Sequence, residues 1–119
     1  MHFAYTIKSR DIVIAKPNYQ SERDNKTRPL LVISKQILTK SDAWFICVGI
    51  SSTEESSPFL IRIDPISDIE SVRLDRTSQV MCHMMATIHE SAIQSKACTV
   101  TSDFYKLVTS KIQTNVLDL

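Results

Sequence analysis

Short apolar runs, rich in β-branched residues and separated by polar segments, make up most of the chain. Their length and composition are typical of strands rather than helices. The run at 44–50 is apolar on both faces, which indicates a central strand. We predict strands over residues 11–16, 30–34, 44–50, 58–63, 78–84 and 96–100, with 86–88 either extending the strand at 78–84 or forming another.

The pattern changes to a helical period near the C-terminus. Ser102 is expected to cap the start of this helix, and Asp103 adds a negative charge at the positive end of its dipole. Several short strands followed by one amphipathic helix predict a mainly β fold, a small barrel or sandwich closed by a C-terminal α-helix. The apolar face of the helix is formed by Phe104, Leu107, Val108, Ile112 and Val116.

Polar segments connect these elements. Residues 19–27 alternate in charge, residues 51–57 are rich in hydroxyl groups, and residues 64–76 form a loop with at most one turn of helix. The chain has one glycine, Gly49, so its turns depend on Pro, Asn, Asp and Ser. With 119 residues, the chain predicts a single domain over 1–119.

Charge and cysteine content narrow the class of protein. The formal net charge is +1, so contact with nucleic acid requires a local basic patch, for which Lys16, Arg23, Lys26 and Arg28 are the best candidates. Cysteines 47, 82 and 98 are widely spaced among apolar residues, which predicts buried, reduced thiols in a cytosolic protein. We find neither an apolar run of membrane-spanning length nor the pattern of a signal peptide.

The strongest candidate for chemistry is Arg28, which precedes Pro29 and four apolar residues. Proline suits the first residue of a strand and biases the residue before it towards an extended conformation. Arg28 is therefore expected at a rigid junction between loop and strand, with its guanidinium pointing into a cleft. The alternative is a surface arginine paired with Glu22 or Asp24.

One ordered set of residues runs through the chain: Asp11-Ile12-Val13, Ser21-Glu22, residues 28–34, residues 48–52, the strand from Ser78 with Thr87-Ile88, and the C-terminal helix. By this set, the chain resembles the MazF/PemK toxins of bacterial type II toxin–antitoxin systems from about Arg10 to its end. The resemblance implies an SH3-like β-barrel with a C-terminal helix, a homodimer, and a cognate antitoxin that blocks the site. It also implies metal-independent cleavage of single-stranded RNA in the cytoplasm, without a cofactor.

The resemblance further implies that Arg28, Ser51 and Glu22 are site residues. Cleavage of RNA by its own 2′-hydroxyl needs a base, an acid and a cation on the phosphate. Arginine binds phosphate through two parallel hydrogen bonds, and a serine hydroxyl can donate a further one. Glu22 is expected to act as the base or to orient Arg28. The candidates for RNA binding are Lys16, Ser21, Arg23, Lys26, Ser52 and His83.

The chain departs from the family pattern at several positions. Arg10 stands where glycine is usual, which is expected to alter only a turn. His83, Met84 and Ala86 replace an acid, a glutamine and a basic residue. This change favours an alternative function, a non-catalytic toxin or binding module on the same barrel, such as a gyrase poison or an inactive homologue. His83 is expected either to supply an acid or base, or to lie half-buried between core methionines.

Three further features have structural interpretations. Met81, Met84 and Met85 are expected in core and dimer packing rather than in a ligand site. Trp44 is expected to be a buried anchor or dimer-interface residue rather than a platform for base stacking. The pair Glu54-Glu55 is expected in a solvated loop.

Overall fold

The computed structural model describes residues 7–17, 26–70 and 77–119. A short 3₁₀ turn, η2 (Glu90–Ala92), joins the last two strands, and helix α1 (Ser102–Lys111) continues into a π-helical turn, η3 (Ile112–Val116). The strands are β1 (Asp11–Ala15), β2 (Arg28–Val32), β3 (Ile37–Leu38), β4 (Ala43–Ser51), β5 (Leu60–Ile63), β6 (Ser78–His89) and β7 (Ile93–Thr99).

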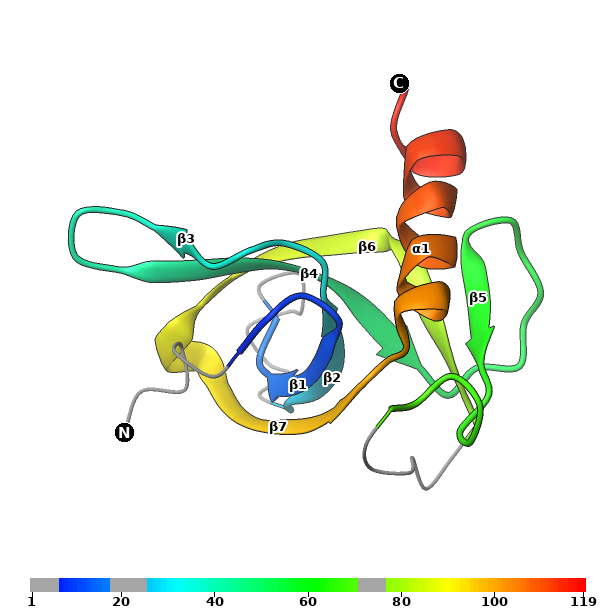
Figure 1. Ribbon diagram of the computed structural model, residues 1–119, viewed down its shortest axis with the longest axis horizontal. Coiled ribbons are helices and arrows are strands. Elements are labelled where there is room, and N and C mark those ends of the chain that lie inside the picture. The colour runs from blue at the N-terminus through cyan, green and yellow to red at the C-terminus, as the bar shows by residue number, and fades with distance from the viewer. Residues whose placement is uncertain (1–6, 18–25, 71–76) are drawn as a thin grey trace.

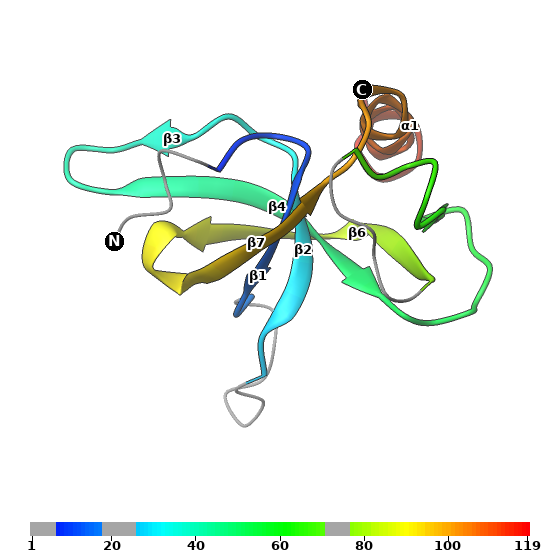
Figure 2. The ribbon, with the colours of Figure 1, turned by 60° about the horizontal axis from the view of Figure 1, so that its bottom comes forward.

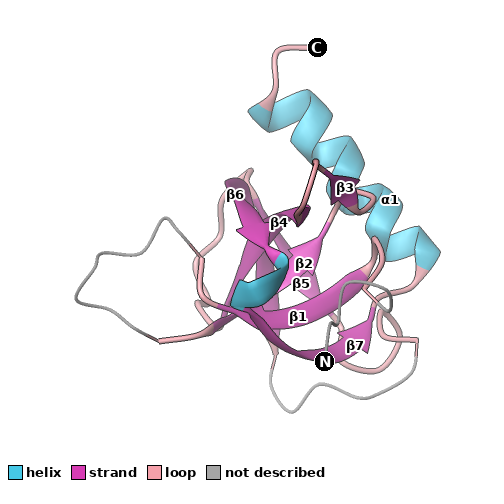
Figure 3. Ribbon diagram, turned by 90° about the vertical axis from the view of Figure 1, so that its left-hand side faces the viewer, coloured by secondary structure: helices cyan, strands magenta, loops and turns pink. Residues whose placement is uncertain are grey.

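The strands form one antiparallel sheet in the order β5-β6-β4-β2-β1-β7, with β3 paired to β4 outside this path. The sheet curves strongly, so that β1 and β7 lie across one part of β4 and β6 (Figures 1 and 3). Within the described residues, the two ends of the order, β5 and β7, do not pair with each other. The predicted mainly β fold with a C-terminal helix is confirmed, as a curved sheet that stays open between these ends.

The two faces of the sheet are buried at different places. Where β4, β5 and β6 meet α1, a first core cluster includes Ile50, Val80, Phe104 and Val108. At the other end of β4 and β6, the curved strands β1, β2 and β7 enclose a second cluster that includes Phe45. Figures 1 and 2 show α1 at one end of the sheet and the β3–β4 hairpin at the other. Among the described residues, α1 therefore covers only the face of Ile50 and Val80, and no helix lies on the opposite face near the ends of β2, β4 and β6.

The strand predictions hold in position and differ at their ends. The central position of β4 is confirmed, because β2 and β6 flank it, and the runs at 78–84 and 86–88 form one strand. The predicted starts of β2 at Leu30 and of β7 at Lys96 are wrong, because these strands begin at Arg28 and Ile93. The structure adds a two-residue strand, β3, between the predicted strands at 30–34 and 44–50.

The N-cap of the helix lies one residue earlier than predicted. Thr101, not Ser102, is the N-cap, because its backbone is extended and its hydroxyl accepts a hydrogen bond from Phe104 N at 3.2 Å. Asp103 lies in the first turn, as predicted. Of the five residues assigned to the apolar face, Leu107 is wrongly placed, since its side chain is 60% exposed.

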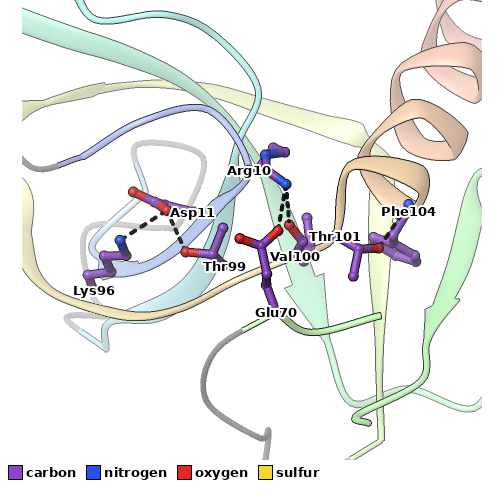
Figure 4. A network of polar contacts seen from close by, with 8 residues as sticks. All are labelled: Arg10, Asp11, Glu70, Lys96, Thr99, Val100, Thr101 and Phe104. Atoms are coloured by element: carbon purple, nitrogen blue, oxygen red, sulfur yellow. Dashed lines mark hydrogen bonds and ion pairs between the residues drawn. The ribbon is translucent and has the colours of Figure 1, made fainter. Parts of the chain in front are cut away.

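Residues at the start of β1 tie it to β7 (Figure 4). Arg10 has a positive φ of 79°, a region that favours glycine. Its guanidinium bonds Glu70 at 2.9 Å and the Val100 carbonyl at 3.2 Å. Asp11 is 2% exposed, and its carboxylate accepts hydrogen bonds from Lys8 N and Thr99 Oγ1, both at 2.8 Å. Lys96 Nζ lies 3.3 Å from the same carboxylate.

The prediction of buried, unpaired cysteines is confirmed for all three. The expectation that the methionines lie in the core is wrong, because Met81 and Met84 are half-buried and Met85 is exposed, whereas their part in dimer packing stays a prediction. None of the described helices is long and apolar enough to cross a membrane.

Candidate active site

Cross-strand pairing places Ser51 in a row of polar side chains. Ser51 at the end of β4 pairs with Gln79 on β6, and Gln79 pairs with Arg62 on β5. On the other side, the β2–β4 ladder ends with the pair Leu30 and Gly49. Arg28 stands two residues before Leu30 and Ser51 two residues after Gly49, so both lie just beyond this end of the ladder and on the same side of the sheet. Residues opposite each other in antiparallel strands point to the same face, with Cβ atoms about 4.5–5.5 Å apart. The order of the row is therefore Arg28, Ser51, Gln79 and Arg62.

This row lies on the open face of the sheet, which we define as the face opposite α1 at Arg28, Ser51, Gln79 and Arg62. The residues that alternate with the row, such as Ile50 and Val80, belong to the core cluster under α1. Because successive side chains of a strand point to opposite faces, the row faces away from the helix. Arg28 and Arg62 are exposed and Ser51 is half-buried.

The Ser51 hydroxyl has a defined hydrogen bond. Its Oγ accepts from the backbone N–H of Thr53 at 3.1 Å. A hydroxyl group has two acceptor lone pairs and one proton, so this contact leaves the proton available for donation.

The predicted basic patch gathers at one end of the β1–β2 hairpin. Ala15 pairs with Arg28, so Lys16, which follows Ala15, leaves the sheet at the same end as Lys26 and Arg28. All three cationic side chains are exposed. The remaining candidates of this hairpin, Ser21, Glu22 and Arg23, lie outside the described residues. Ser52, which follows Ser51, is exposed beside the row.

His83 also belongs to the open face. It stands two residues after Met81 and four residues after Gln79 on β6, so the three side chains point to the same side of the strand. The expectation that His83 is half-buried between core methionines is wrong, because its side chain is exposed and packs on Phe59, with ring centroids 5.3 Å apart. Ala86, by contrast, is buried in the second core cluster.

Sequence reasoning missed two members of the row, Gln79 and Arg62. Arg62 is an exposed residue of β5. Gln79 is only 5% exposed, although nothing in its sequence neighbourhood marks it as buried. Only the pairing of β6 with both neighbours reveals that the two residues lie in line with Ser51.

The three cysteine thiols, all among the described residues, do not offer a competing nucleophile. Burial raises the pKa of the Cys47 thiol from 9.0 to about 12, and burial also raises the pKa of the Cys82 and Cys98 thiols. Such thiols are weak nucleophiles near neutral pH. In the part of the chain that the structure describes, no three His, Cys, Asp or Glu side chains gather as a metal site.

A second surface feature lies at the far end of β4. Trp44 is half-buried rather than fully buried, and its ring meets the edge of His89 at 4.8 Å. It lines a hollow of about 360 Å³ with Ile37, Thr39, Ile46 and Thr87. The role of Trp44 in a dimer interface stays a prediction. Glu54 and Glu55 are exposed in the loop after β4, as expected.

Comparisons with known proteins identify relatives of this chain. A family model described as PemK-like, MazF-like toxin of type II toxin–antitoxin system matches residues 8–116. Among solved structures, an endoribonuclease in complex with its cognate antitoxin, from a mycobacterial species, is 14% identical with a TM-score of 0.68; the match covers 91% of this chain and 92% of that one.

Two further structures have the same fold. The Mycobacterium tuberculosis toxin MazF-mt6 is 16% identical over 87% of this chain and 92% of its own, with a TM-score of 0.65. A mycobacterial endoribonuclease is also 16% identical, over 91% of this chain and 85% of its own, with a TM-score of 0.60. A comparison with curated proteins found no match. At these identities the structural likeness establishes the fold.

Proposed function

The chain belongs to the family of PemK-like, MazF-like toxins of type II toxin–antitoxin systems, and from this premise we propose that it is a metal-independent endoribonuclease acting on single-stranded RNA. The structural neighbours described as endoribonucleases support this proposal. The observation that supports it most is the register of β2 with β4, in which Arg28 and Ser51 each stand two residues beyond the terminal Leu30–Gly49 pair, on the open face.

The chemistry of the proposed reaction begins with attack by the 2′-hydroxyl of a ribose on the adjacent phosphorus. The bond to the 5′-oxygen of the next nucleotide breaks, leaving a 2′,3′-cyclic phosphate and a free 5′-hydroxyl. Arg28 binds two phosphate oxygens and stabilises the charge that develops on them, because a guanidinium stays protonated and matches phosphate geometry. The Ser51 hydroxyl donates a hydrogen bond to a phosphate oxygen.

Proton transfer requires further groups near the row. We assign Glu22 as the base that takes the proton of the 2′-hydroxyl. If Glu22 does not reach the 2′-oxygen, we assign it to orienting Arg28. His83, which is exposed on the same face of β6, is the further candidate for the acid or base. Lys16, Ser21, Arg23, Lys26 and Ser52 are assigned to the neighbouring phosphates and sugars of the strand.

The proposal includes partners and location. We propose a cytoplasmic homodimer whose site is blocked by a cognate antitoxin. The mycobacterial endoribonuclease solved with its cognate antitoxin supports this assignment. Co-expression with the neighbouring open reading frame, followed by size-exclusion chromatography, tests it. A toxin that elutes as a monomer and is not captured by that partner would contradict it.

Incubation of the purified protein with a long single-stranded RNA in EDTA tests the activity. We expect fragments that end in 2′,3′-cyclic phosphate, and no cleavage where a 2′-deoxynucleotide replaces the attacking ribose. Absence of cleavage, or cleavage of the deoxy substrate, would contradict the proposed reaction. A protein purified without tags and a mock preparation from cells lacking the gene serve as controls for contaminating nuclease.

A non-catalytic toxin on the same fold is the second candidate. It is favoured by β6, where Met84 and Ala86 replace the polar residues usual in the family and Ala86 is buried. Expression in cells separates the two functions: rapid loss of mRNA indicates the nuclease, whereas DNA breaks or filamentation without mRNA loss indicate the poison.

A further inference from the structure

We propose that Gln79 is a positioning residue for this reaction, holding the loop that follows Ser51 and thereby fixing the direction of the Ser51 hydroxyl. The inference rests on the proposed nuclease function. It concerns a residue that does not reach the substrate itself.

Gln79 is an unusual residue in this molecule. Among the described residues, it and Asp11 are the only buried polar or charged side chains. Its Nε2 donates to the carbonyl oxygens of Thr53 and Glu55, both at 2.8 Å. The two N–H groups of one side chain thus hold two carbonyls of the loop, and the loop covers the side chain in return.

These two contacts continue a chain of hydrogen bonds that starts at Ser51. Thr53 N donates to Ser51 Oγ at 3.1 Å, and Glu55 N donates to Thr53 Oγ1 at 3.2 Å. Gln79 therefore binds the carbonyl groups of Thr53 and Glu55, the same two residues whose N–H groups donate within the loop. Since Thr53 N occupies one lone pair of the Ser51 hydroxyl, a displacement of Thr53 would free the hydroxyl to rotate.

Strand pairing explains why this residue is suited to the task. Gln79 is the direct partner of Ser51 in the β4–β6 ladder. Its backbone holds the strand end on which Ser51 sits, and its side chain holds the loop on the other side of Ser51. A hydroxyl fixed from both sides loses less entropy when it meets the charge of the transition state.

The alternative is a purely structural role, in which Gln79 only satisfies two buried carbonyls. Gln79→Glu separates the two interpretations, because it keeps the size of the side chain but places a carboxylate against two carbonyl oxygens. Gln79→Leu is the second variant, which removes the donors without adding charge. Gln94→Glu, on the exposed side of β7, is the matched control for the added charge.

We expect kcat for RNA cleavage to fall about 10- to 100-fold in Gln79→Glu with KM within about 2-fold, less than the full loss of a charge-stabilising donor. In a Ser51→Ala background the same change should cost less than about 3-fold, because the hydroxyl it positions is already gone. Equal losses in both backgrounds, or a rise in KM with kcat unchanged, would overturn the proposal.

Amide hydrogen exchange supplies a readout independent of cleavage. Gln79→Glu and Gln79→Leu should both speed exchange at Thr53 by at least about 10-fold, while the core strand amides keep their protection. Unchanged exchange at Thr53 in folded variants overturns the proposal even where the wild-type protein cleaves RNA. If the wild-type protein does not cleave RNA, the nuclease assignment fails and the catalytic role of Gln79 with it, whereas the exchange result still shows whether Gln79 orders the loop.

Discussion

Replacing Asp11 with alanine should destabilise the fold far more than breaking the neighbouring surface ion pair. The Asp11 carboxylate is buried at the junction of β1 and β7 and accepts from Lys8 N and Thr99 Oγ1, both at 2.8 Å (Figure 4). Each of these donors loses its charged acceptor in the variant, at about 1–3 kcal/mol each. The Lys96 contact adds little, because its side chain is 41% exposed and can turn to water.

The sum predicts a loss of about 2–6 kcal/mol in the free energy of unfolding, a large share of the about 5–15 kcal/mol typical of a domain. Urea denaturation followed by circular dichroism measures it. Glu70→Gln is the matched control, since the Arg10–Glu70 pair joins side chains that are 31% and 53% exposed and should contribute at most about 1 kcal/mol. Asp11→Ala and Glu70→Gln with equal midpoints would refute the reasoning.

Three further outcomes are expected. Thr101→Ala should lower stability by about 1 kcal/mol in a thermal melt, and an equal effect of Ser102→Ala would contradict the assigned cap. Cys47 should resist alkylation at pH 8 until the protein unfolds. Because its folded pKa is raised from 9.0 to about 12, stability should hold below pH 9 and fall as the pH rises towards 12, less steeply in Cys47→Ala. Affinity for an uncleavable 2′-deoxy strand should fall with salt, and Lys26→Ala should reduce the log–log slope by about 0.7; an unchanged slope would remove Lys26 from the interface.

The sequence pattern predicted the strands and the helix because their apolar residues are buried on defined faces. It failed at positions where apolar residues are exposed or polar residues are buried. β3 is two exposed residues, Ile37 and Leu38, so no alternation marks it. β7 begins with buried Ile93 but continues through the exposed residues 94–96, as expected of a strand at the edge of the order.

The candidate site was predictable only in part. The order of Arg28 and Ser51 along the chain suggested two strand ends, but register decides whether such ends meet, and register is a long-range property. Gln79 was missed because its burial comes from a loop that folds over it. Arg10 lies in a turn with a positive φ, which favours glycine, but the expectation that it alters only a turn was too narrow, because its guanidinium also bonds Glu70 and the Val100 carbonyl.

The rate of RNA cleavage by Arg28→Ala, measured in EDTA beside the wild type, is the most direct test of the site on the open face. Lys26→Ala, which removes a nearby cation outside the row, is the matched control. The account predicts a loss of about 100- to 1,000-fold in kcat for Arg28→Ala and a change mainly in KM for Lys26→Ala. Equal rates for Arg28→Ala and the wild type would contradict it.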